Sequence, residues 1–109
     1  MILFELHFQV DPQKRQDFEK AYAEIFAPAI SKQKGFRTLK LLRLFSPQQV
    51  AEIQASPTEY DYQINFTFDS EADRRVWAKS PDHDVAWPKL SAIASKFFWR
   101  GYDLLASKD

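Results

Sequence analysis

The chain has 109 residues, enough for one domain with its own core, and we take residues 1–109 as a single domain. It has no cysteine, which excludes thiol catalysis, iron–sulfur clusters and cysteine-ligated zinc. Its 15 acidic and 15 basic side chains cancel and are interspersed, without the basic stripe of a nucleic-acid-binding protein. No segment reaches the roughly 20 apolar residues of a membrane span, and the N-terminus has no secretory leader pattern. We expect a cytoplasmic protein that binds neither nucleic acid nor membrane.

The first third of the chain predicts a strand followed by a helix. Residues 2–10, ILFELHFQV, alternate between apolar and polar side chains, which is typical of a strand with one apolar face. Asp11 and Pro12 predict a helix N-cap and first helical residue, and apolar residues recur at helical spacing up to residue 29. Pro28 is expected to kink or shorten this helix, and Gly35 is a candidate C-cap.

Two further strands follow. Residues 36–45, FRTLKLLRLF, predict a second strand that is apolar on both faces. Residues 46–58 form a connection bounded by prolines, with a short helical turn expected at 50–55. Residues 59–69, EYDYQINFTFD, alternate again and predict a third strand.

The last third predicts a broken helix and a closing strand. Ser70 is a candidate N-cap for a helix that runs through Trp77. Ser80 is a second N-cap, and apolar residues then recur at helical spacing from residue 86 to 97. Pro88 is expected to bend this helix or delay its regular start. Residues 97–106, FFWRGYDLLA, predict the fourth strand.

This β-α-β-β-α-β order predicts an α+β, ferredoxin-like antiparallel sheet with strand order 4-1-3-2. The helices should cover the face that is apolar along the first and third strands. The other face has a polar centre, formed by Glu5, His7, Gln9, Gln63, Asn65 and Thr67. Large apolar groups are expected along its margins: Leu39, Leu41 and Phe45 on one edge, and Tyr102 and Leu104, or Phe97, Trp99 and Leu105, on the other.

Apolar margins on an open sheet face are unusual for a monomer. They predict a homodimer in which two sheets enclose a cavity for a small aromatic or apolar molecule. The alternative is an ordinary half-solvated antiparallel sheet.

Two histidines are candidates for proton transfer. His7 shares a strand face with Glu5, which could orient it, while Gln63 or Asn65 could complete a hydrogen-bonded set. His83 lies near the start of a helix, where the helix dipole lowers its pKa and favours the neutral imidazole. Alternatively, His7 is an interface residue whose hydrogen bonds are all satisfied. His83 is alternatively a surface residue, or a hydrogen-bonded residue that holds the break between two helices. Asp82 and Asp84 flank His83, but consecutive helical residues point in different directions and cannot bind one metal ion together. No metal site is therefore expected.

The segment FTFDSEADRRVWAKSPDHDVAWPKL (residues 66–90), the order of elements and the aromatic closing strand resemble the antibiotic biosynthesis monooxygenase family. The resemblance extends from the first strand to about Leu105, and it implies a dimeric α+β barrel. Some members of that family oxygenate aromatic polyketides or quinols without flavin, haem or metal. They deprotonate the substrate in a polar pocket, and the resulting carbanion reacts with oxygen.

The resemblance implies two alternative functions. In the first, a cofactor-independent monooxygenase acts on a small aromatic or quinol-like substrate. Its catalytic residues would be His83 or His7 as base, with Asn65 and Arg43 stabilising negative charge; its substrate-binding residues would be Trp77, Glu5, Gln63 and Tyr102. In the second, a non-catalytic or stress-related barrel binds a small apolar ligand.

The family's haem-degrading branch is a poorer match. It has an Asn on the first strand, which is absent here. It also has a His about ten residues after the tryptophan, where this chain has Trp87.

Overall fold

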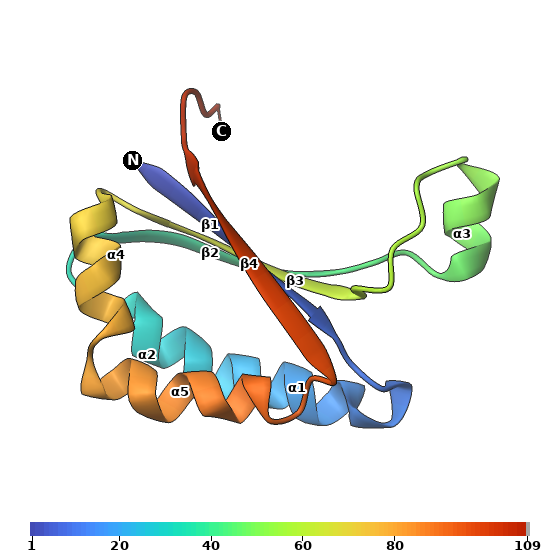
Figure 1. Ribbon diagram of the computed structural model, residues 1–109, viewed down its shortest axis with the longest axis horizontal. Coiled ribbons are helices and arrows are strands. Elements are labelled where there is room, and N and C mark those ends of the chain that lie inside the picture. The colour runs from blue at the N-terminus through green and yellow to red at the C-terminus, as the bar shows by residue number, and fades with distance from the viewer. Residues whose placement is uncertain (109) are drawn as a thin grey trace.

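The chain folds into a four-stranded antiparallel sheet with helices against one face (Figure 1). The computed structural model describes residues 1–108. In chain order the elements are β1 (Ile2–Gln9), a 3₁₀ turn (Pro12–Lys14), α1 (Arg15–Ala21), a π-helical turn (Tyr22–Phe26), α2 (Ala27–Ser31), β2 (Phe36–Arg43), α3 (Pro47–Glu52), β3 (Tyr62–Phe68), α4 (Glu71–Ala78), α5 (Pro81–Ser91) and β4 (Lys96–Asp103). The predicted ferredoxin-like fold class is confirmed.

The strand order is β2-β3-β1-β4, as predicted, with β1 and β3 in the centre. All neighbouring strands are antiparallel. Leu6 of β1 lies opposite Ile64 of β3 on one side and Trp99 of β4 on the other. Residues opposite one another in an antiparallel pair point to the same face, so this register determines which face every side chain of the sheet occupies.

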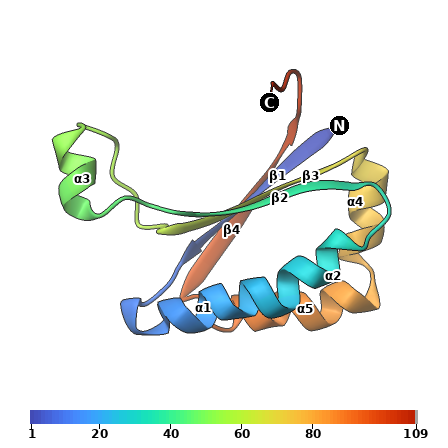
Figure 2. The same cartoon turned by 180° about the vertical axis from the view of Figure 1, so that it is seen from behind.

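The main core lies between the sheet and the helices α1, α2, α4 and α5, which the two opposite views place on the same side (Figures 1 and 2). Its fully buried members include Phe8, Phe18, Ile64, Phe68 and Leu90. Burial of side chains of this size stabilises the fold by about 1.5–3 kcal/mol each, relative to leaving them exposed. The opposite sheet face carries no helix, and we call it the open face.

The helical run after β1 is continuous although it contains Pro28. Asp11 accepts a hydrogen bond from the backbone of Gln13, as expected of an N-cap. A π-helical turn then precedes α2, and the backbone N–H of Ala27 bonds to Tyr22, five residues earlier. The wider turn gives the chain room for a proline that has no N–H to donate. The helix predicted to kink or shorten at Pro28 instead continues to Ser31 and changes locally in helix type before the proline.

Gly35 is not the helix C-cap, because α2 ends at Ser31. Gly35 lies in the turn before β2 with φ of +82°, a conformation that residues with a β-carbon rarely adopt. A β-carbon there would also lie 2.3 Å from Oδ2 of Asp73 on α4. The glycine is needed for this turn and for its close approach to α4.

Ser80 joins α4 to α5. Its hydroxyl donates to the carbonyl of Trp77 (2.8 Å) and accepts from the backbone N–H of His83 (3.1 Å). One side chain thus completes the end of α4 and the start of α5, as the sequence predicts for the N-cap. Pro88 does not delay α5, which begins at Pro81, and the helix ends at Ser91, before Phe97 enters β4.

Residues 44–61 form an arm that projects from one end of the sheet and carries α3 (Figure 1). The arm begins and ends at a backbone hydrogen bond from Leu44 to Asp61 (2.9 Å). Its helix starts at Pro47, earlier than predicted, because Ser46 and Gln49 form a capping box. Phe45 and Ile53 on the arm are 57% and 59% exposed.

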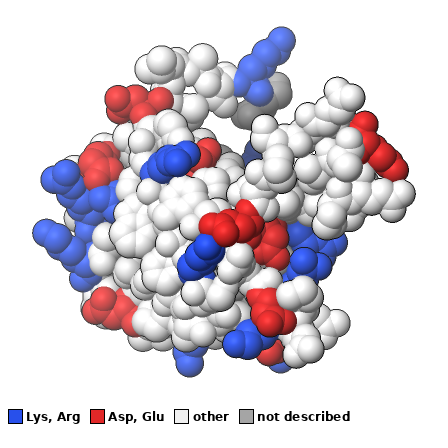
Figure 3. Space-filling view, turned by 45° about the vertical axis from the view of Figure 1, so that its right-hand side comes forward, with Lys and Arg blue, Asp and Glu red and all other residues white. Residues whose placement is uncertain are grey.

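The longest helix, α5, has 11 residues, and within residues 1–108 no helix has the length and apolar character needed to cross a bilayer. On the face seen in Figure 3, acidic and basic side chains are interspersed around uncharged surface.

We predict that Ser80→Ala lowers the free energy of unfolding by about 1–2 kcal/mol, because it removes an N-cap inside the packed helix layer. Urea unfolding followed by circular dichroism measures this. Ser46→Ala is the matched control, since it removes the N-cap of α3, which lies outside the main core. An equal loss of stability in the two variants would contradict the structural role assigned to Ser80.

Candidate functional site

The pairing register divides the predicted site residues between the two faces of the sheet. Five of them belong to the open face: Glu5, His7, Gln63, Asn65 and Tyr102. Trp77 and His83 lie under the opposite face, on α4 and α5. The two candidate bases are therefore separated by the sheet and cannot belong to one site in one chain.

On the open face, His7 already has partners. Its Nε2 lies 3.1 Å from a Glu5 carboxylate oxygen, as the shared strand face predicts. Its ring stacks on Phe98 with centroids 4.4 Å apart and planes at 4°. Gln63 donates a hydrogen bond to Asn65 (2.8 Å). A concavity of about 770 Å³ is lined by three predicted site residues, His7, Gln63 and Arg43, and also by Arg100.

Arg43 is not brought together with Asn65. It lies opposite Tyr62, whose face is the helix side of the sheet. Its guanidinium forms an ion pair with Glu19 of α1 (3.5 Å), and the Tyr62 hydroxyl also donates to Glu19. Arg43 thus links the end of β2 to α1.

The predicted margins of the open face need correction on the β2 side. Leu39 and Leu41 lie opposite Phe66 and Ile64, so they point toward the helices and are half-buried. Leu42 takes their place on the open face and is 43% exposed. On the other edge Tyr102 belongs to the open face, whereas Phe97 and Trp99 belong to the helix side.

A second pocket, of about 190 Å³, lies between the sheet and the helices α4 and α5. Six of its lining residues are aromatic: Phe4, Phe26, Phe66, Trp77, Trp87 and Trp99. Only two of its lining residues are ionisable, Arg74 and His83. We call this space the helix-side pocket.

Helical spacing and the Ser80 elbow bring the pocket residues together. Arg74 and Trp77 are three residues apart on α4 and share a helix face. His83 and Trp87 are four residues apart on α5 and share a face as well. Because Ser80 caps one helix and ends the other, the two faces converge on the same space.

His83 lies between two tryptophans. The edge of its ring meets Trp77 at a centroid distance of 5.0 Å, and it is nearly parallel to Trp87 at 6.3 Å. Burial lowers the pKa of His83 below its ordinary value; the carboxylate of Asp84 opposes this shift, and the charge of Arg74 adds to it. The result agrees with the sequence prediction of a neutral imidazole, but its main cause is desolvation rather than the helix dipole.

Arg74 is the ionisable pocket residue that the sequence analysis missed. Its guanidinium lies 4.3 Å from the centroid of the Phe4 ring and forms two hydrogen bonds with Glu71, at 2.8 and 2.5 Å. Its side chain is only 18% exposed. The available signal was its position one helical turn before Trp77, which places an arginine on the same helix face as a predicted wall residue.

Gly101 keeps the floor of the pocket in place. It lies opposite Phe4 in the sheet, and a β-carbon at this position would approach Phe4 Cε1 to 2.7 Å. The ring of Phe4 therefore lies over the glycine and stacks on Phe66 at 5.6 Å. A side chain at position 101 would push the Phe4 ring toward Arg74 or the pocket.

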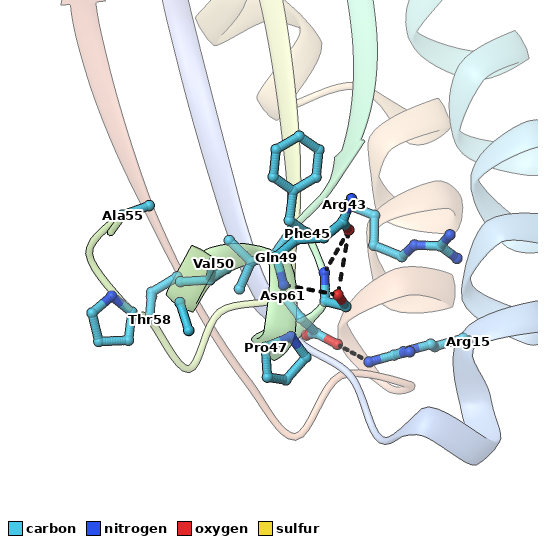
Figure 4. A pocket seen from close by; sticks show the side chains of 13 residues that line it. Arg15, Arg43, Phe45, Pro47, Gln49, Val50, Ala55, Thr58 and Asp61 are labelled. Atoms are coloured by element: carbon cyan, nitrogen blue, oxygen red, sulfur yellow. Dashed lines mark hydrogen bonds and ion pairs between the residues drawn. The ribbon is translucent and has the colours of Figure 1, made fainter. Parts of the chain in front are cut away.

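A wider concavity, of about 930 Å³, lies under the arm (Figure 4). It is lined mainly by apolar and proline residues of the arm, and its charged groups Arg15 and Asp61 already pair at 3.4 Å. Of the predicted site residues it includes only Arg43. Its lining contains no histidine, so it lacks the combination of a base and a cation that the helix-side pocket has.

The helix-side pocket combines three chemical features. Its aromatic walls can hold a planar aromatic ligand. A neutral imidazole can accept a proton near pH 7. A guanidinium in a water-poor space can stabilise an oxygen anion. Together these features suit proton abstraction from an aromatic ligand.

Neither a family model nor a curated protein sequence matches this chain. Solved structures, however, share its fold over nearly the whole length. SnoaB, a cofactor-independent oxygenase from Streptomyces nogalater, is 17% identical, with a TM-score of 0.74 over 97% of this chain and 94% of that chain. A candidate antibiotic biosynthesis monooxygenase from Caulobacter crescentus is 15% identical, with a TM-score of 0.73 over 96% of this chain and 90% of that chain.

A dimeric ferredoxin-like protein of unknown function from Thermobifida fusca is 15% identical, with a TM-score of 0.70 over 94% of this chain and 90% of that chain. At these identities the likeness is one of fold. The predicted resemblance to antibiotic biosynthesis monooxygenases is confirmed at that level.

We predict that the His83 imidazole titrates below the ordinary histidine value of 6.5, because its cation is poorly solvated between the tryptophans. NMR titration of the ring protons measures this pKa, with His83→Gln used to assign the signals. Since the unfolded chain then takes up its proton at a higher pH than the folded chain, His83 contributes stability above pH 6.5. This contribution is lost as the pH falls through the folded-state pKa. Wild type should therefore lose more stability than His83→Gln on acidification, and a midpoint at or above 6.5 would contradict the assignment.

Proposed function

We propose that this protein is a cofactor-independent oxygenase that converts a small phenol-type aromatic substrate to a quinone in the helix-side pocket. The observation that carries the proposal is the presence of a half-buried histidine and an arginine in a pocket whose other lining residues are apolar, most of them aromatic. The fold shared with SnoaB supports it further, although one fold can host several chemistries.

In the proposed reaction His83 takes the phenolic proton. The resulting anion carries electron density on its oxygen and on the ring carbon opposite it. Dioxygen accepts two electrons from the ring, in one-electron steps, and forms a C–O bond at that carbon. The hydrogen of that ring carbon then passes as a proton to the outer oxygen of the peroxide while the O–O bond breaks. Hydroxide leaves and is protonated by the His83 imidazolium, so one substrate and one O₂ give one quinone and one water.

Each pocket residue has a defined task in this scheme. His83 is the catalytic base and later the acid. Arg74 holds the phenolate oxygen and stabilises its charge. Trp77, Trp87 and Phe4 hold the ring and exclude water, which keeps the imidazole neutral.

A non-catalytic ligand-binding barrel remains the second candidate. It is favoured by the fact that no hydrogen bond joins the His83 ring to another of residues 1–108, whereas catalytic bases are commonly oriented by a third group. Haem degradation is less compatible with the pocket. The helix-side pocket has a volume of about 190 Å³, which is below the roughly 300–1,000 Å³ of sites for drug-sized ligands, and haem is at least as large as such ligands.

Oxygen uptake with 1-naphthol, a two-ring phenol, tests the proposal. We expect wild type to consume one O₂ for each 1,4-naphthoquinone formed. Because proton transfer to a positioned base contributes about 10²–10⁴-fold, His83→Gln should lower kcat by at least about 100-fold. His7→Gln is the matched control, since it changes the other histidine on the opposite sheet face, and it should keep wild-type turnover.

The two variants also separate the alternatives. Equal loss of activity in both would argue against the helix-side pocket as the active site. Full activity in His83→Gln would exclude His83 as the base. Binding of 1-naphthol without oxygen uptake would favour the ligand-binding barrel.

We further propose that two chains associate through their open faces. Leu42 and Tyr102 on this face are 43% and 44% exposed, and the polar cluster around His7 lies between them in the sheet. Solvent-exposed large apolar groups on a sheet face are stabilised when a second sheet covers them. The Thermobifida fusca neighbour of the same fold is described as dimeric, which supports this arrangement.

We predict a mass of twice 12.8 kDa in solution by light scattering. Leu42→Glu should shift the protein to the monomer, because each chain would bury an unpaired carboxylate in the interface. Val85→Glu is the control, since Val85 is exposed on α5, away from the open face. A wild-type monomer, or dissociation by Val85→Glu alone, would contradict the proposed interface.

A further inference from the structure

The guanidinium of Arg74 has one edge engaged and one edge free. Its Nε and Nη2 donate to the two carboxylate oxygens of Glu71. Among residues 1–108 no acceptor bonds to Nη1, and Nη1 is not a fully buried atom. Since Arg74 lines the pocket and lies over Phe4, this free edge can donate hydrogen bonds to a ligand there.

The charge beside the pocket is also incompletely balanced. Glu71 serves two arginines, because its Oε1 also accepts from Nε of Arg75 at 3.2 Å. Glu71 is therefore shared between two guanidinium groups and neutralises Arg74 only in part. Asp84, the other carboxylate near the pocket, acts on His83. The second ionisable residue of the pocket, His83, adds no negative charge in either protonation state. The Arg74 side chain is only 18% exposed, and partial removal from water strengthens the attraction of its charge for an anion.

Pocket volume restricts the size of such an anion. A cavity on the order of 150 Å³ holds one benzene molecule, and the helix-side pocket measures about 190 Å³. One ring therefore fits within this volume and a second fused ring has to extend into the opening of the pocket, whereas a larger ring system would have to displace Phe4 or Trp99. Phe4 lies directly against Gly101 and cannot move further toward the strand.

We infer that Arg74 makes the helix-side pocket selective for aromatic anions of one or two rings. This inference rests on the site used in the proposed function and names the class of molecule it takes. It assigns to Arg74 the recognition of the oxyanion, through the free Nη1 edge, and to the tryptophans the recognition of the ring. It applies to a carboxylate as well as to a phenolate, so it can be tested with a ligand that the protein cannot oxygenate.

The test compares 2-naphthoate with 2-naphthamide, which have the same rings but differ in charge. Calorimetry at pH 7.5 gives both affinities, and tryptophan fluorescence reports binding at the site, because two of the chain's three tryptophans, Trp77 and Trp87, flank His83 there. We expect wild type to bind the naphthoate at least about 10-fold more tightly, as expected for a charge-assisted hydrogen bond. Arg74→Gln should weaken naphthoate binding by about 10- to 100-fold and naphthamide binding by a smaller factor, because a neutral carbonyl accepts a weaker hydrogen bond from the same donor.

Arg75→Gln is the matched control. Arg75 is the adjacent residue, pairs with the same carboxylate and has a side chain that is 68% exposed, outside the pocket lining. It should retain the preference for naphthoate. An equal effect of Arg74→Gln and Arg75→Gln would replace specific recognition by a general effect of net charge and overturn the inference.

Two further measurements keep the test decisive. If Arg74→Gln fails to fold, the wild-type comparison still decides, since equal affinity for naphthoate and naphthamide overturns the inference. Pyrene-1-carboxylate, with four fused rings, should bind at least about 10-fold more weakly than naphthoate, and tighter binding would overturn the size limit. Naphthoate selectivity that depends on Arg74 but occurs without oxygen uptake from 1-naphthol would reject the proposed oxygenase function alone.

Discussion

The antiparallel register of β1 between β3 and β4 is the constraint on which the rest of the structure depends. Side chains along a strand alternate between faces with a period of two. Leu6 and Phe8 therefore point into the helix layer, and His7 between them points to the open face. A slip of one residue would bury His7 and expose the core side chains. The same register determines that Trp99 borders the helix-side pocket while Phe98 stacks on His7.

Burial on the helix side then creates the chemistry of the pocket. Trp77 is 2% exposed, so it belongs to the core and is at the same time a pocket wall. The imidazole of His83 lies against it and loses solvation, which lowers its pKa. Packing and reactivity thus have one physical origin in this region. The residues that keep the space open are small: Gly101 beneath Phe4, and Ser80 between the two helices.

The open face has a different character. Four of its central polar residues form two pairs, Glu5 with His7 and Gln63 with Asn65. Lys40 and Arg100 of the edge strands also lie on this face. Paired polar groups tolerate burial far better than unpaired ones, which suits an interface between sheets. Polar residues at the centre of a sheet face can therefore form either a catalytic site or an interface in which they hydrogen-bond to one another. The contacts of His7 on this face favour the interface.

Local sequence determined much of this protein. Alternation in residues 2–10 and 59–69 determined two strands and their buried faces, and Ser70 and Ser80 determined the starts of α4 and α5, because period and capping act over a few residues. Only the tertiary structure decided which residues share a site. β2 is apolar on both faces, so pairing with β3 was needed to place Leu41 inside and Leu42 outside. The position of Arg74 in the site also depends on tertiary structure. Its contact with Phe4 and its proximity to His83 bring together β1, α4 and α5, and contacts between residues so distant in sequence leave no local pattern.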